Sequence, residues 1–174
     1  MMNVFLTGTI GAGKSTMVQR LLSLYPGKPV HGFYTRKEPA GDGGISRICI
    51  HGAKAPLWTL SGANCFATCA GIDIIVDVRV LETIGVELLC GIPPGSLVVM
   101  DELGFLESGA PAFCAKVLEI LGGPYQVVGT LRDGDTAFLQ AVREHPSTLL
   151  YRVTPADRDT LFARICQDLQ DTAR

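Results

Sequence analysis

One short segment near the start of the chain restricts its possible folds more than any other feature. Residues 8–15 read Gly-Thr-Ile-Gly-Ala-Gly-Lys-Ser, which matches the pattern G-x-x-x-x-G-K-[ST]. The mostly apolar residues 3–7 precede this segment and predict a strand, while residues 15–25 follow it with apolar side chains at helical spacing. A strand, a glycine-rich loop and a helix in this order predict a phosphate-binding loop.

The residue types in this loop suit the binding of a nucleoside triphosphate. Glycines let the backbone N–H groups point inward, so that they form an anion-binding nest at the positive end of the helix dipole. Lys14 is expected to reach the β- and γ-phosphates, and the Ser15 hydroxyl to coordinate Mg²⁺. Thr16 is expected, by analogy, to contact the α-phosphate. The predicted nucleotide-binding residues are Gly8, Thr9, Ile10, Gly11, Ala12, Gly13, Lys14, Ser15 and Thr16.

The remainder of the chain alternates strand patterns with helical ones, which is typical of an α/β fold with a mainly parallel sheet covered on both faces. Residues 30–37 and 45–51, joined by a turn over 38–44, predict an antiparallel hairpin insertion. Residues 96–100 form a continuous apolar run, as in a strand buried on both faces. We predict one domain over residues 1–174. Further strands are expected at 56–60, 72–78, 125–131 and 148–153, and helices at 80–90, 110–121, 133–144 with an Asp cap, and from Thr154 with Pro155 first in the helix.

Two carboxylates follow the buried strand at 96–100. Asp101 is the candidate to hold Mg²⁺ through water, because phosphate loops use an acid at the end of a neighbouring strand. Glu102 is the candidate catalytic residue that orients or deprotonates the attacking water. The alternative for Glu102 is a solvated loop acid or an ion-pair partner.

Three arginines and one threonine are candidates to contact the transferred phosphate. Positive charge stabilises the equatorial oxygens of the transition state, and Arg36, Arg79 and Arg132 are the candidate sources. A surface ion pair is the alternative for each of them. Thr130, near the end of its strand, is a candidate γ-phosphate sensor, and the 38–44 turn is a candidate flap over the nucleotide.

The net charge and the length of the apolar stretches exclude two classes of binding partner, nucleic acids and membranes. The formal net charge is −2, without a basic stripe, so we expect no nucleic-acid binding. Apolar stretches are interrupted well before the roughly 18 residues that a membrane span needs, and no signal peptide is evident, so we expect a cytoplasmic protein with no membrane association.

The cysteines and the single tryptophan are expected to be structural. The six cysteines lie in apolar contexts and are expected to be free buried thiols. Cys65 and Cys69 form the only close pair, and no second Cys or His pair lies nearby in the sequence to complete a zinc site. Trp58 is expected to pack rather than to stack on a base.

Several separate stretches together resemble a known family, the small cytoplasmic nucleoside-triphosphatases of the cancer-related nucleoside-triphosphatase type. They are the phosphate loop, the Gly-Phe-Tyr-Thr strand at 32–35, the Asp-Glu-x-Gly-x-x-Glu pattern at 101–107, Gly129 with Thr130, and Arg158, Asp159 and Leu161. The resemblance implies a RecA-like or AAA-like core that hydrolyses ATP, GTP and other nucleoside triphosphates to diphosphate and phosphate, with Mg²⁺ and loose base selectivity.

The leading hypothesis is therefore a Mg²⁺-dependent nucleoside-triphosphate phosphohydrolase in which Lys14 and Glu102 are catalytic and Ser15 and Asp101 hold the metal. Two alternatives remain open. A small-molecule or nucleotide kinase shares the loop and the size of the chain, and a nucleotide switch would hydrolyse its nucleotide only when activated by a partner. The sequence names no protein partner.

Overall fold

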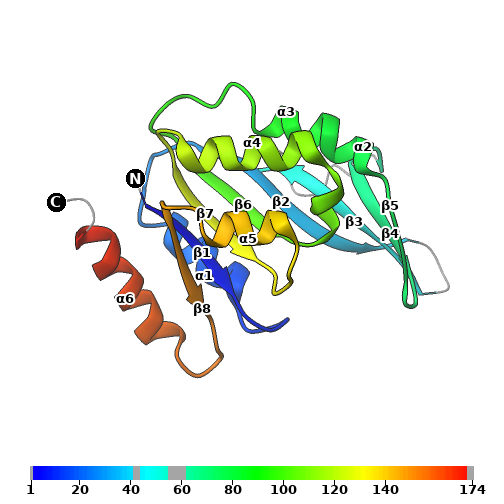
Figure 1. Cartoon of the computed structure of the whole chain (residues 1–174). Helices are drawn as coiled ribbons and strands as arrows, with labels where there is room; N and C mark the ends of the chain where they lie inside the picture. Colours follow the sequence, from blue (N-terminus) through cyan, green and yellow to red (C-terminus); the bar gives the residue numbers. More distant parts are fainter. Residues whose placement is uncertain (1, 41–43, 55–61, 172–174) are drawn as a thin grey trace.

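The computed structural model describes residues 2–40, 44–54 and 62–171, and a single sheet runs through this part of the chain (Figure 1). Its order is β5-β4-β3-β2-β6-β7-β1-β8. Five adjacent strands are parallel to one another, namely β2, β6, β7, β1 and β8, whereas β3, β4 and β5 are antiparallel to their neighbours. The bounds are β1 (Asn3–Thr7), β2 (Val30–Pro39), β3 (Ile45–Gly52), β4 (Cys65–Ala70), β5 (Asp73–Val76), β6 (Leu97–Leu103), β7 (Gln126–Leu131) and β8 (Thr148–Arg152).

Helices cover both faces of the sheet, and each layer has its own apolar core. One face carries α1 (Lys14–Leu22) and α6 (Arg158–Asp171), which pack through side chains such as Val18 and Ile165. The other carries α2 (Val78–Val80), α3 (Val86–Leu88), α4 (Pro111–Gly122) and α5 (Ala137–Arg143), with Phe113 among its buried residues. The predicted α/β class, with a mainly parallel sheet and an antiparallel insertion, is confirmed.

The middle of the parallel sheet is packed too closely for a side chain at one position. A Cβ atom at Gly129 on β7 would lie 2.6 Å from the Met100 carbonyl oxygen and 2.7 Å from Cε1 of Phe5. Phe5 is the Cα partner of Gly129 in the neighbouring strand, and both Phe5 and Met100 are fully buried. Only glycine therefore lets β1, β6 and β7 approach with this register.

Helix boundaries differ from the sequence expectation at three places. The predicted helix at 80–90 spans α2 and α3, with a π-helical turn between them at Leu81–Gly85. The helix expected from 133 begins at Ala137 instead, because Thr136 rather than an Asp is the cap and its hydroxyl accepts from the Leu139 N–H. The last helix begins at Arg158 rather than directly after Thr154. There the Asp157 carboxylate accepts from the Thr154 N–H, which closes a turn ahead of the helix.

The antiparallel part of the sheet is larger than predicted, and it corrects the expectation for two cysteines. Strand β4 was not predicted; it pairs with β3 and places Cys65 opposite Cys49, with which it forms a disulfide. The expectation that all six cysteines are free thiols is therefore wrong for this pair, because facing positions on neighbouring antiparallel strands bring the side chains together. Cys69, Cys90, Cys114 and Cys166 are free, but the expected burial holds for Cys69 alone of these four: Cys114 and Cys166 are partly buried and Cys90 is exposed.

Other expectations concern a region only partly described. The candidate strand at 56–60, together with Trp58, lies outside the described residues, as do residues 41–43 of the candidate flap. Within the part of the chain that the structure describes, no helix has the length and apolar character needed to cross a membrane.

Candidate functional site

The loop at residues 8–13 turns sharply between β1 and α1. Gly8, Gly11 and Gly13 have φ angles of 138°, 81° and 98°, a region that glycine adopts readily and other residues rarely. Gly8 also lies so close to β8 that a Cβ atom there would be 2.5 Å from the Val153 carbonyl oxygen. The local sequence therefore permits a backbone path that side chains would block, and it places the loop amides at the start of α1.

Lys14 lies across this loop. Its Nζ donates to the carbonyl oxygens of Gly8 at 2.8 Å and Thr9 at 3.1 Å. The side chain is therefore held over the concave face of the loop, where its charge is available to an anion.

The acid at the end of β6 is buried in the sheet. Asp101 Oδ1 accepts a hydrogen bond of 2.7 Å from the Thr130 hydroxyl on β7. Asp101 Oδ2 is 3.7 Å from Nη1 of Arg36 and has no hydrogen-bond partner within the described ranges. Buried carboxylate oxygens are normally satisfied, so this oxygen is well placed to bind a ligand through the cavity that Ser15 also lines.

Glu102 lies between two cations. Its Oε1 is 3.0 Å from Nε of Arg132, and its Oε2 is 4.0 Å from Nζ of Lys14. Its backbone N–H donates to the Thr35 hydroxyl at 3.0 Å, which fixes the residue against β2. Burial raises the pKa of Glu102, the charges of Arg132 and Lys14 lower it, and Asp101 raises it further. Glu102 is therefore a partly buried carboxylate with a shifted pKa, which is typical of side chains that accept or donate a proton during catalysis.

The structure brings together two of the three candidate arginines. Arg132 and Arg36 both line the cavity with Asp101 and Glu102. Arg79 does not, because its side chain is 86% exposed and its guanidinium pairs with Asp77, the N-cap residue of α2. Thr130 is fully buried and donates to Asp101, so it lies behind the acid as its hydrogen-bond partner.

Some residues of this cavity were not singled out individually by the sequence reasoning. Thr35 and Lys37 line it from β2, because β2 pairs directly with β6 and Tyr34 is opposite Asp101. The strand order, which the sequence does not state, is what places them there. Lys37 also lines the neighbouring hollow over the phosphate loop, together with Lys14 and Thr16.

Glu107 is a second buried acid at the edge of the cavity. It is 4% exposed, and its Oε2 accepts from the Gly104 N–H at 2.9 Å. Burial is the main cause that raises its pKa to about 7, and the nearby Glu102 adds to the rise. Glu107 thereby folds the segment after Glu102 back against the end of β6.

A further hollow lies on the other side of the loop. It is lined by Gly13, Thr16 and Arg20 from the loop and α1, by residues 155–156 from the turn before α6, and by residues 158–160 at the start of α6. The Arg158 side chain lies against Gly13, since a Cβ atom there would be 3.1 Å from its Cδ. This hollow adjoins the predicted α-phosphate contact, Thr16.

The acidic pair lies near the end of β6, and β7 separates this strand from β1, so the expected acid is not on the strand next to the loop. A glycine-rich nest between β1 and α1, with this acidic pair at the same edge of the parallel sheet, defines a P-loop nucleoside-triphosphate-binding fold. Within that class, the chain belongs to the NTPase family, whose family model matches residues 3–166.

Two curated relatives illustrate the similarity. The chain is 27% identical to the cancer-related nucleoside-triphosphatase homolog of Bos taurus, with 99% of this chain and 98% of that protein aligned. It is 30% identical to nucleoside-triphosphatase THEP1 of Thermofilum pendens, with 96% and 94% aligned. The family resemblance inferred from the sequence is therefore confirmed.

Two solved structures share the fold. THEP1 from Aquifex aeolicus superimposes with a TM-score of 0.67 at 23% identity, covering 94% of this chain and 96% of that one. A human cancer-related nucleoside triphosphatase also gives a TM-score of 0.67 at 23% identity, covering 98% of each chain.

Proposed function

We propose that this protein hydrolyses nucleoside 5′-triphosphates to nucleoside diphosphates and phosphate, with Mg²⁺ as cofactor and loose selectivity for the base. The observation that carries the proposal is the meeting of Lys14 with the Asp101–Glu102 pair, which come from different parts of the chain and line adjoining hollows. The relatives named as nucleoside-triphosphatases support the same activity here.

The donor set fits a small hard cation. Ser15 offers a hydroxyl, and Asp101 a buried carboxylate oxygen that has no hydrogen-bond partner among the described residues; Mg²⁺ prefers oxygen ligands. When bound, Mg²⁺ would neutralise charge on the β- and γ-phosphates. Ser15 would hold it directly and Asp101 through water, while Thr130 keeps Asp101 oriented through its hydrogen bond.

The chain's own residues divide the remaining work. Loop amides and Lys14 hold the phosphates, with Lys14 moving its ammonium from the loop carbonyls of Gly8 and Thr9 to the bound anion. Glu102 orients the attacking water and accepts its proton. Arg132 keeps the Glu102 carboxylate in place, and its charge adjoins the site of the transferred group.

The proposal includes the domain organisation, the cellular location and the binding partner of the protein. Residues 1–174 are treated as one domain, because a single sheet connects the described segments. Resemblance to small cytoplasmic nucleoside-triphosphatases supports a cytoplasmic location. The partner is the triphosphate, and the net charge of −2 argues against nucleic acid.

Phosphate release tests the proposal directly. Wild-type protein is incubated with ATP, GTP, CTP or UTP, in Mg²⁺ and in EDTA, beside Lys14→Ala and the matched control Lys28→Ala, whose side chain is exposed. We expect Mg²⁺-dependent release from all four nucleotides with wild type and with Lys28→Ala, and its loss with Lys14→Ala.

Other outcomes point elsewhere. Release that appears only on adding a phosphoryl acceptor would indicate a kinase. Tight binding without release, relieved by a protein partner, would indicate a switch. Equal release by Lys14→Ala would show that the loop is not the catalytic centre.

A further inference from the structure

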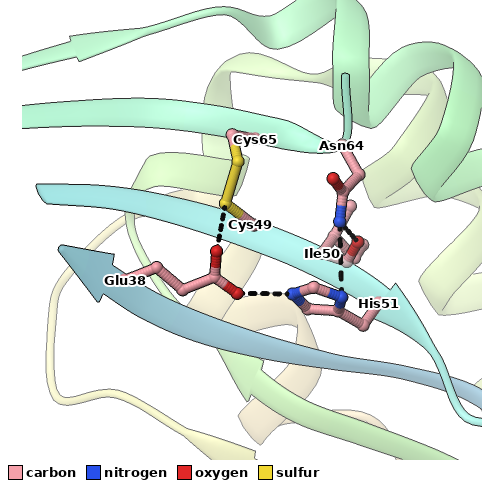
Figure 2. The surroundings of a disulfide bond; sticks show 6 residues. All are labelled: Glu38, Cys49, Ile50, His51, Asn64 and Cys65. Carbon is pink, nitrogen blue, oxygen red and sulfur yellow. Dashed lines mark hydrogen bonds and ion pairs between the residues drawn. A yellow bond between two sulfur atoms is a disulfide. The ribbon is translucent and has the colours of Figure 1, made fainter. Parts of the chain in front are cut away.

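A second group of reactive side chains lies where three strands adjoin, outside the cavity described above. We call it the sulfur cluster: Glu38 on β2, Cys49 and His51 on β3, and Cys65 on β4. Figure 2 shows the Glu38 carboxylate between the His51 ring and the Cys49–Cys65 disulfide. None of the four residues lines the hollows around the phosphate loop.

Glu38 directs both carboxylate oxygens into this cluster. Its Oε1 accepts from Nε2 of His51 at 3.0 Å, and its Oε2 lies 3.5 Å from Sγ of Cys49. A disulfide sulfur carries no proton to donate, so the second oxygen faces sulfur without a hydrogen bond from it. The Glu38 side chain is 22% exposed, so its carboxylate has lost most of its contact with water. The disulfide donates no hydrogen bond to compensate for this loss of solvation.

His51 is held in a fixed orientation. Its ring is 2% exposed, and Nδ1 lies 3.4 Å from the side-chain nitrogen of Asn64, which also donates to the Ile50 carbonyl oxygen at 2.8 Å. With Nδ1 as acceptor, Nε2 carries the proton that is donated to Glu38. A buried histidine that orients a carboxylate is a frequent support for a metal ligand.

We propose that, when the Cys49–Cys65 disulfide is reduced, Glu38, Cys49 and Cys65 bind a soft divalent cation such as Zn²⁺, with His51 as the positioning residue for Glu38. One ligand atom from each of the three lies within 4.8 Å of the other two. Zinc bonds of about 2.3 Å to sulfur and about 2.0–2.2 Å to oxygen place tetrahedral ligands about 3.5–4 Å apart. Water completes the fourth position.

The chemistry balances with a dithiol as reductant. Two electrons and two protons pass from the dithiol to the protein disulfide, which gives two cysteine thiols and the oxidised, cyclic reductant. Zn²⁺ then replaces the two thiol protons, which go to solvent, and the metal is held by two thiolates and the Glu38 carboxylate. A disulfide oxidant reverses the sequence: the thiolates lose two electrons to it, form the protein disulfide and release the metal.

Cobalt(II) tests this proposal independently of hydrolysis, because tetrahedral thiolate sites give intense visible bands and sulfur-to-cobalt charge transfer. Protein reduced with a phosphine and freed of metal is titrated with Co²⁺ in the absence of nucleotide. We expect one equivalent to give the charge-transfer band in reduced protein, no band in oxidised protein, and displacement by Zn²⁺. Co²⁺ at Ser15 and Asp101 would lack the sulfur band, so the two sites are distinguishable.

Variants assign the ligands. Cys65→Ser and Cys49→Ser are expected to lose the charge-transfer band or shift it, and Cys69→Ser, a free cysteine on the same strand, to retain it. Glu38→Gln removes the charge of one ligand. His51→Ala removes the side chain that orients Glu38, and we expect it to weaken Zn²⁺ binding about 10-fold to 100-fold in competition with a coloured chelator.

A readout in the wild-type chain covers any variant that does not fold. Zn²⁺ is expected to protect the partly exposed Cys65, but not the exposed Cys90, from alkylation of the reduced protein, as measured by peptide mass spectrometry. The proposal is overturned if reduced wild type shows no sulfur band, or if the band survives both serine substitutions in folded protein. Equal alkylation of Cys65 with and without Zn²⁺ would overturn it as well.

Discussion

Replacing Glu102 with Gln separates its catalytic role from its structural one. The amide has nearly the same shape, and its oxygen can still accept from Nε of Arg132, as Oε1 now does at 3.0 Å. The substitution removes the negative charge and the ability to take a proton from water. If Glu102 orients and deprotonates the attacking water, the rate of hydrolysis falls while the fold and the nucleotide site remain.

The geometry around Glu102 gives the expected size of the change in stability and of the change in hydrolysis rate. At an effective dielectric constant of about 20, unit charges 4 Å apart interact by about 4 kcal/mol, but Glu102 and Arg132 are 29% and 35% exposed. Solvent screening reduces such a pair to about 1 kcal/mol or less, and the desolvation that raises the Glu102 pKa is relieved in the amide. Loss of a general base costs about 10²-fold to 10⁴-fold in kcat, or about 3–5 kcal/mol of activation free energy.

The assay therefore compares three quantities for Glu102→Gln and wild type: kcat for phosphate release, Kd for a fluorescent triphosphate analogue with Mg²⁺, and the free energy of unfolding in urea. We expect a large fall in kcat with a Kd that is equal or lower, because one negative charge beside the triphosphate is gone. Glu119→Gln, on the exposed side of α4, is the matched control and should match wild type in all three. Phosphate release at the wild-type rate by folded Glu102→Gln would remove Glu102 from the mechanism.

Two further predictions concern stability. Because the folded-state pKa of Glu107 is raised from 4.5 to about 7, the folded protein keeps a proton that the unfolded chain loses between these values, and the free energy of unfolding falls as pH rises through that interval. Between about pH 5 and pH 8, wild type should lose on the order of 3 kcal/mol relative to Glu107→Gln in urea unfolding, and parallel pH profiles would contradict this. Gly129→Ala should destabilise by about 1–3 kcal/mol, because its methyl group meets Met100 and Phe5. Gly122→Ala should stay close to wild type, because its methyl group would meet Nε2 of His145 at 3.8 Å, an ordinary van der Waals distance.

The sequence predicted those parts of the fold that are determined locally. The phosphate loop needs glycine at fixed positions, and β6 needs a continuous apolar run because both its faces are buried. Both signals lie within a few residues of the features that they specify. The same holds for the acids at the end of β6, since the carboxyl ends of parallel strands share one edge of the sheet.

Contacts between distant segments were beyond such reasoning. The pairing of β3 with β4 depends on the register of two strands, and no spacing in the sequence reveals that Cys49 faces Cys65 rather than that Cys65 pairs with Cys69. Arg79 shows the same limit from the other direction. It was a candidate for the site, but the sheet order leaves it at the surface with Asp77.

Strand β2 links the proposed catalytic site to the sulfur cluster. Thr35 accepts from the Glu102 N–H and Arg36 lies 3.7 Å from Asp101, while Glu38 contacts His51 two residues further along. Side chains two apart on a strand share a face, so Arg36 and Glu38 lie on the same side of β2. A shift of Glu38 from the disulfide to a bound cation would therefore act on the strand that supports the acidic pair. Phosphate release should accordingly be measured with the Cys49–Cys65 disulfide both intact and reduced, because this disulfide joins β3 to β4 and Glu38 of β2 lies against it.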